Sequence, residues 1–171
     1  MRSSQELRAH ISLRRLQPEE APRYKTLRLE ALKNDPGMFG NRYELEAAYS
    51  EERWTERLVN PNGACFGLFY HEELIGITGI IIDKEEPAEA HLTQSYIRDN
   101  YRGRQLSRLF YEARIAWAKQ HNLSRLIISH RESNVISKAA NQHFGFRYTH
   151  RETKLWPDGQ QEDVLYYVLE L

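Results

Sequence analysis

The chain has 171 residues, a length that suits one domain with a hydrophobic core of its own. Its 24 lysine and arginine residues balance 24 aspartate and glutamate residues, so no net field draws it to nucleic acid or to an anionic membrane. A single cysteine excludes an intrachain disulfide, and no apolar run approaches the ~20 residues of a membrane span. We therefore expect residues 1–171 to form one cytoplasmic domain, an enzyme or a binding module.

The first part of the chain predicts one strand and two helices. Residues 10–16 alternate well enough for a strand. Pro18 and the two acids after it are typical of a helix start, and this helix should run to about Asn34. The hydroxyl of Ser50 can cap a second helix, which the residues 60–63 (NPNG) should end.

Three strands, a basic turn and a long helix are predicted next. The strands are expected at residues 64–70, 74–83 and 90–97, where apolar and β-branched residues run without a breaker. From Leu106 to Trp117, apolar residues recur at helical spacing. The turn before this helix contains one glycine among four arginines: Arg98, Arg102, Arg104 and Arg108.

The basic turn is interpreted as a phosphate-binding site. A helix N-terminus offers unpaired N–H groups and the positive end of the helix dipole, and arginines beside it add to the attraction for anions. The alternative is that the arginines only solvate the polar face of an amphipathic helix.

The last part of the chain predicts a strand, a helix and a hairpin. Residues 125–129 are a short apolar run suited to a buried parallel strand. A helix should follow from about residue 134 to 144, with Gly145 as its stop. Residues 146–155 and 163–171 then read as a hairpin. The element order indicates an α+β fold whose central parallel pair is joined by a right-handed crossover.

Three motifs, whose order and spacing along the chain match those of the family, resemble motifs of the GNAT superfamily of N-acetyltransferases. Residues 102–107 (RGRQLS) are similar to its acyl-CoA-binding motif, Q/R-x-x-G-x-G/A, except that Gln105 replaces a glycine and Ser107 the final glycine or alanine. Residues 133–137 (SNVIS), followed by Gly145-Phe146, resemble the N-x-x-A/S … G-F signature. Residues 27–32 are similar to the opening of many small bacterial members.

This resemblance covers nearly the whole chain and carries expectations about fold and function. It implies a mixed central sheet of six to seven strands with a splayed parallel pair, flanked by about four helices. It implies transfer of an acetyl group from acetyl-CoA to a primary amine of a small molecule or peptide terminus, by direct attack in a ternary complex and without a metal. The acceptor (amino acid, polyamine, antibiotic or protein) and a homodimer stay open, and neither nucleic acid nor membrane is an expected partner.

The resemblance also implies where acetyl-CoA would lie. Its pantetheine arm should follow the backbone near Tyr96 and Ile97, where a backbone N–H would bind the thioester oxygen. Its pyrophosphate should lie on the basic turn. The expected cofactor-binding residues are Tyr96, Ile97, Arg102, Gly103, Arg104, Gln105, Leu106, Ser107, Asn134 and Ser137. For Asn134 a plain helix cap is the alternative.

The catalytic base is predicted to be His91. Strand alternation places it on the face of Thr93 and Ser95, about where several family members carry a glutamate base, and an imidazole suits proton transfer near neutral pH. His130, just past the neighbouring strand, is the second candidate. For both histidines the alternative is a structural, hydrogen-bonded role.

This chain departs from the family pattern at the position of the general acid. Many members place a tyrosine four residues before the Gly-Phe pair, and this chain has Asn141 there. An amide can hydrogen-bond but cannot give up a proton, so Asn141 would assist the leaving thiolate only by hydrogen bonding, with Ser137 or water helping. The departures at Gln105, Ser107 and Asn141 motivate a second hypothesis, a non-catalytic domain that binds or senses acyl-CoA.

Overall fold

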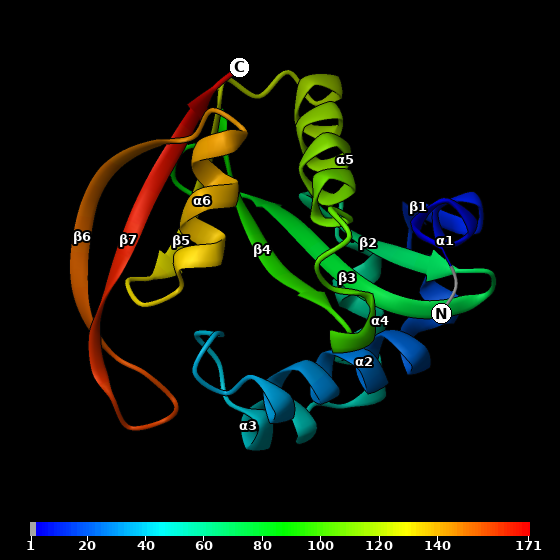
Figure 1. The fold of residues 1–171 in the computed structure, drawn as a ribbon. Helices are drawn as coiled ribbons and strands as arrows, with labels where there is room; N and C mark the ends of the chain where they lie inside the picture. The colour runs from blue at the N-terminus through cyan, green and yellow to red at the C-terminus, as the bar shows by residue number, and fades with distance from the viewer. Residues whose placement is uncertain (1–2) are drawn as a thin grey trace.

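We describe the protein from a computed structural model, which covers residues 3–171. Seven strands form one mixed sheet in the order β1-β2-β3-β4-β5-β7-β6 (Figure 1). The strands are β1 (Ile11–Arg15), β2 (Gly63–Tyr70), β3 (Glu73–Ile82), β4 (Glu89–Ile97), β5 (Arg125–Arg131), β6 (Arg147–Leu155) and β7 (Gln161–Glu170). The helices in this range are α1 (Ser4–Ala9), α2 (Ala21–Asn34), α3 (Tyr43–Ala47), α4 (Glu51–Val59), α5 (Ser107–Gln120) and α6 (Val135–His143).

The predicted α+β fold is confirmed, including its one parallel pair, β4 and β5. Every predicted strand and helix is present, and Ser50 caps α4 by accepting a hydrogen bond from the N–H of Arg53 at 3.2 Å. Two short helices, α1 and α3, were not predicted, because five or six residues are too few to show a helical period. No helix in residues 3–171 is long and apolar enough to cross a membrane.

The sheet is covered on both faces. Alternation along β2 shows the two layers: Cys65 and Phe69 belong to the hydrophobic cluster beneath α2 and α4, whereas Ala64 and Phe66 belong to the cluster beneath α5. All residues of β2 are buried as a result, which explains why this strand reads as a continuous apolar run.

The two parallel strands separate along their length. They pair only at Glu89–His91 and Arg125–Ile127, and beyond these residues they diverge (Figure 1). β4 also carries a bulge, because Ile77 pairs with Tyr96 but Gly79 pairs with Thr93. Gln94 lies in this bulge with a left-handed φ of 61°. The bulge shifts the alternation of side chains along β4. Because β5 has diverged by this point, the edge of β4 toward β5 has no strand partner there.

Candidate active site

The turn before α5 has the backbone shape of an anion site. Gly103 and Gln105 have left-handed φ angles of 75° and 61°, and Leu106 is right-handed. Such alternation turns successive N–H groups toward one side. Within residues 3–171, no side chain caps the start of α5, so its first N–H groups are free for a ligand. Gln105 therefore adopts the backbone conformation that glycine favours, at a cost of roughly 1–2 kcal/mol.

The four arginines of the turn have different roles. Arg102 braces it, donating to the carbonyl oxygen of Ile97 at 2.6 Å and to the carboxylate of Asp35, at the end of α2, at 2.9 Å. Arg98 and Arg108 are likewise engaged with carboxylates. Arg104 makes only a long contact, 3.5 Å, to a backbone oxygen. Among the described residues it is the arginine of this turn without a carboxylate partner.

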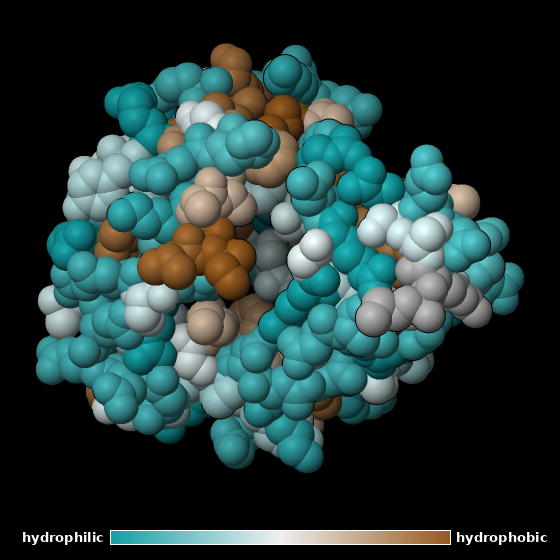
Figure 2. All heavy atoms as spheres, in the orientation of Figure 1, coloured by the Kyte–Doolittle hydropathy of each residue, from teal (hydrophilic) through white to brown (hydrophobic). Residues whose placement is uncertain are grey.

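A cavity of about 420 Å³ extends from this turn along the end of β4. Its lining includes most of the predicted cofactor residues: Tyr96, Ile97, Arg102, Gly103, Gln105, Leu106, Ser107 and Asn134. Arg104 does not line it. Figure 2 shows the surface hollowed in this region, beside apolar side chains. Ile136, on the rim, is 82% exposed, and Val135 beside it is 67% exposed.

Two further cavities continue from the first through the gap between β4 and β5. The middle one, about 150 Å³, shares Ser95 and Asn134 with the first. The last, about 580 Å³, shares Gln94, Ser129 and His130 with the middle one and opens toward α2, α4 and the β6–β7 hairpin. Met38 and Phe39 line all three. The cavities thus form one row that connects the basic turn to a separate chamber, which we call the far chamber.

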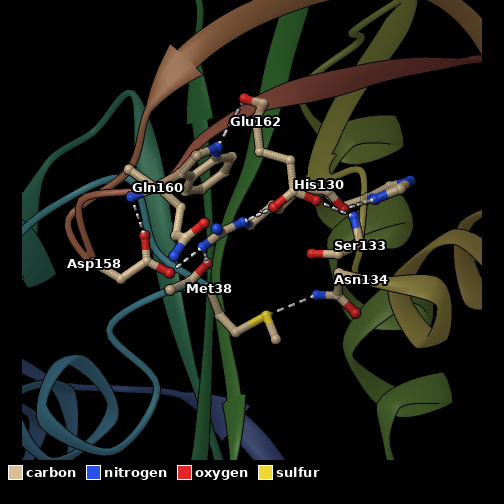
Figure 3. A network of polar contacts seen from close by, with 10 residues as sticks. Met38, His130, Ser133, Asn134, Asp158, Gln160 and Glu162 are labelled. Carbon is tan, nitrogen blue, oxygen red and sulfur yellow. Dashed lines mark hydrogen bonds and ion pairs between the residues drawn. The ribbon is translucent and has the colours of Figure 1, made fainter.

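The loop that carries Met38 and Phe39 is fastened across this row by Arg131. This buried side chain donates to the carbonyl oxygen of Gly37 at 2.9 Å and to Asp158 in the β6–β7 turn at 2.6 Å, and it is also paired with Glu162. Figure 3 shows these carboxylates converging, with Met38 reaching toward Asn134. Sequence reasoning missed this clamp, because its partners lie up to 94 residues apart.

His91 is not placed in the gap where it was expected. It lies where β4 and β5 still pair, and its imidazole contacts the carboxylate of Asp83 at 2.7 Å. It lines none of the three cavities. The expectation differed because the two strands separate only after His91. Asp83 is the group that this pair affects: the hydrogen bond from His91 lowers the pKa of Asp83 to about 2.

His130, the second candidate for the catalytic base, lines both the middle cavity and the far chamber. Its Nδ1 lies 2.6 Å from the carbonyl oxygen of Arg131 and must donate to it, so in the neutral ring Nε2 is an acceptor. The hydroxyl of Tyr167 lies 3.1 Å from Nε2 and donates to it. Burial lowers the pKa of His130, which keeps the ring neutral near pH 7.

Asn141 is buried at the middle cavity and is held by a residue that the sequence did not single out. The Tyr111 hydroxyl donates to Asn141 Oδ1 at 2.5 Å, and burial raises the pKa of Tyr111, so the phenol stays protonated. This contact fixes the orientation of the amide. Asn141 Nδ2 is buried and has no hydrogen-bond partner among residues 3–171. It is therefore a donor available to a ligand in the cavity.

Asn134 and Ser137 lie at the start of α6. Asn134 Oδ1 accepts from the N–H of Ser137 at 3.1 Å, which confirms the helix cap. Its Nδ2 lies on the other side, 3.4 Å from the sulfur of Met38, at the junction of the first two cavities. Ser137 lines the middle cavity only. A cofactor contact of Asn134 stays a prediction, because the cap accounts for its oxygen but not for its N–H groups.

The remaining reactive groups do not form a further centre. Burial raises the pKa of the Cys65 thiol, which keeps this residue of the far chamber protonated. Within residues 3–171, no group of three or more His, Cys, Asp or Glu side chains could hold a metal ion.

The neutrality of His130 has a measurable consequence. In the unfolded chain a histidine has a pKa of ~6.5, and in the folded protein the pKa of His130 is lower. Below pH ~6.5 the unfolded state therefore binds more protons than the folded state, so the free energy of unfolding falls as the pH falls. We expect the variant His130→Gln to lose less of its unfolding free energy than the wild type between about pH 6.5 and pH 5. Urea titrations across this range measure it, with the exposed His143→Gln as control. Equal pH slopes for the wild type and His130→Gln would contradict the neutral, buried imidazole.

A family model described as "Acetyltransferase (GNAT) family" matches residues 23–146. Among solved structures, an acetyltransferase of the GNAT family from Streptococcus pneumoniae has a TM-score of 0.82 at 18% identity, and the match covers 94% of this chain and 99% of that one. A ribosomal-protein-alanine N-acetyltransferase from Brucella melitensis gives 0.79 at 17% identity, with the same two coverages.

A third solved structure holds a ligand. RimL, a ribosomal α-N-protein acetyltransferase in complex with coenzyme A, has a TM-score of 0.75 at 14% identity, covering 96% of each chain. At these identities the likeness establishes the fold alone. No curated protein matches the chain.

Proposed function

This chain belongs to the GNAT acetyltransferase family and is an N-acetyltransferase; from that premise we propose that it transfers the acetyl group of acetyl-CoA to a primary amine of a small molecule or a peptide terminus. The observation that carries the proposal is the row of three cavities through the separated strands. It joins an anion-binding turn at one end to a chamber that can admit an amine at the other.

The residues of the turn fit the pyrophosphate of coenzyme A. The N–H groups from Gln105 to Arg108 supply backbone donors, and Arg104 supplies a charged donor. The pantetheine arm would follow the unpaired edge of β4 toward the bulge at Gln94. The thioester carbonyl would then lie in the middle cavity, where the backbone N–H groups of the bulge can stabilise its oxyanion.

The amine would enter from the far chamber. Its nitrogen attacks the thioester carbonyl and forms the N–C bond, and the C–S bond then breaks to release the thiolate. The amine loses one proton in this step, and we assign its acceptance to Nε2 of His130, after the Tyr167 hydroxyl has released that atom or by relay through it. The Asn141 N–H is assigned to the thiolate as a hydrogen-bond donor.

The assignment of Asn141 predicts a loss of turnover. Replacing Asn141 by leucine and Tyr111 by phenylalanine together removes both polar partners, so neither is left buried and unpaired. We expect kcat to fall by about tenfold to hundredfold, the effect of one charge-assisted hydrogen bond, with unchanged affinity for CoA. Tyr111→Phe alone keeps the amide and should retain most of the turnover. If it is as slow as the double variant, turnover depends on the Tyr111 hydroxyl, either as the donor itself or as the group that orients the amide.

The assignment of Arg104 predicts a loss of CoA affinity without a loss of stability. Arg104→Ala removes a charged donor to the pyrophosphate and should weaken CoA binding by about tenfold to hundredfold in calorimetry at low salt. Because Arg104 has no carboxylate partner in the folded protein, Tm should stay unchanged. Arg102→Ala, by contrast, should lower Tm as well, since Arg102 braces the turn. The control is Arg108→Ala, which removes an exposed arginine paired with Glu112. Equal affinities for the wild type and Arg104→Ala would remove Arg104 from the phosphate site.

Thiol release in the presence of a panel of primary amines tests the function itself. We expect CoA to be released with at least one amine and the acetylated product to be found by mass spectrometry. CoA binding without release for any amine would favour the alternative, a non-catalytic domain that binds acyl-CoA.

A further inference from the structure

The far chamber is cationic. Arg28, Arg57 and Lys154 line it, and none of the described residues that line it carries a carboxylate. Burial has lowered the pKa of His130, so that ring adds no charge near neutral pH. Lys154, from β6, lies with its Nζ 4.9 Å from the centre of the Trp156 ring, and in residues 3–171 it has no ion-pair partner.

The two arginines share a single carboxylate. Arg28 donates to both oxygens of Glu46, at 3.1 and 2.8 Å, and Arg57 donates to one of them at 2.6 Å. Glu46 is fully buried behind the chamber wall. Burial acts to raise its pKa, but the two guanidinium groups lower it overall, so it stays charged. Two positive charges against one negative leave this cluster with a net charge of +1.

One donor of the cluster is unused. Arg28 Nη1 is buried and has no hydrogen-bond partner in residues 3–171. The Arg28 side chain lines the chamber and is 6% exposed. A buried, charged N–H without an acceptor costs free energy that a ligand oxygen can recover. The guanidinium is held by Glu46 on one side and by the ring of Phe39, 5.0 Å away, on another. It is therefore fixed in place before any ligand arrives.

We propose that the acceptor amine carries a carboxylate, which Arg28 Nη1 binds in the far chamber with the help of Arg57 and Lys154. This inference rests on the proposed acetyl transfer and names the acceptor class. Guanidinium groups are the side chains best suited to carboxylates, and the net positive field of the chamber opposes a second cation. We therefore expect polyamines to be poor acceptors. The carboxylate can be that of an amino acid or an acidic side chain next to a peptide N-terminus.

The test compares acceptors that differ in this one group. One arm pairs free amino acids with their carboxamides; another pairs short peptide amides that have aspartate or asparagine at the second position; spermidine forms the third. We expect kcat/KM to be about tenfold to hundredfold higher for the carboxylate in one of the first two arms, which identifies the source, and no turnover of spermidine. Equal kcat/KM within both pairs overturns the proposal and leaves acetyl transfer standing.

Two variants locate the preference. Arg28→Lys keeps the charge but loses the fork that holds Glu46 and presents Nη1, and Lys154→Met removes the unpaired cation. Each should reduce the preference for the carboxylate while CoA affinity stays near that of the wild type. Tm should also stay near the wild-type value for Lys154→Met, but it should fall for Arg28→Lys, because the buried Glu46 then loses one of its two hydrogen bonds from residue 28. Lys119→Met, which removes an exposed lysine at the end of α5, is the matched control. A preference that survives both chamber variants would overturn the assignment to these residues.

Binding without chemistry separates this proposal from the enzymatic one. The same pairs are titrated calorimetrically into the wild-type protein saturated with CoA, where no acetyl group is present. Tighter binding of the carboxylate member supports the chamber even if no amine is turned over. Equal binding of both members in both arms overturns it even if the enzyme is active.

Discussion

Replacing His130 by glutamine is expected to lower kcat by roughly 10²–10⁴-fold, the range for loss of a general base. The reason is its position: it is the one histidine among the described residues lining the cavities, and its Nε2 is an acceptor. Affinity for CoA should stay unchanged, because His130 does not line the cavity at the basic turn. Steady-state kinetics at saturating acetyl-CoA, with calorimetry for CoA, measure both quantities.

Two companion variants make this result specific. His91→Gln should leave turnover near that of the wild type, since His91 is paired with Asp83 outside the cavities. Tyr167→Phe decides the route of the proton: retained turnover indicates direct transfer to Nε2, and lost turnover indicates relay through the hydroxyl. If His91→Gln is the slow variant and His130→Gln is not, the base is the residue that strand alternation predicted.

The second large effect is expected at Gln105. Proline there has no N–H and its φ is confined near −65°, whereas Gln105 has a φ of 61°. We expect Gln105→Pro to weaken CoA binding by at least about a hundredfold, because a charge-assisted donor is lost and the remaining N–H groups turn away. Calorimetry measures the affinity, and circular dichroism checks that the fold persists.

Gln105→Gly is the matched control for that experiment. Glycine adopts a positive φ without strain, so this variant should bind CoA like the wild type. It restores the family's glycine, and it tests whether the backbone shape of the turn, and not the glutamine side chain, matters. Unchanged affinity in a folded Gln105→Pro protein would place the pyrophosphate elsewhere.

Residue patterns along the chain were enough to predict the strands, the main helices and the basic turn. Periods of two and of 3.6 residues located the strands and main helices, because such patterns record which face each element buries. Ser50 predicted the start of α4, and the arginine-rich turn with its glycine predicted an anion site. Such predictions are possible because caps and turns depend on residues a few positions apart. These interactions join residues that are near one another in the sequence, so the sequence is enough to predict them.

Which of the candidate residues line the cavities could not be predicted in this way, because it depends on how the elements pack. The point at which β4 and β5 separate depends on strand pairing, and because it comes only after His91, the predicted base lies outside the gap. Arg102 and Arg104 look equivalent in the sequence, but in the structure Asp35 pairs with Arg102 and not with Arg104. Pairing of this kind depends on how distant elements pack, which single-chain patterns do not encode.

The far chamber illustrates the same division. Arg28 and Glu46 lie 18 residues apart on different helices, and the sequence around α3 carried no sign that Glu46 would be buried between two arginines. The sequence predicted where an acetyl donor would bind, because phosphate recognition uses a short run of backbone. The proposed acceptor site uses side chains from α2, α4 and β6, and only packing brings these together.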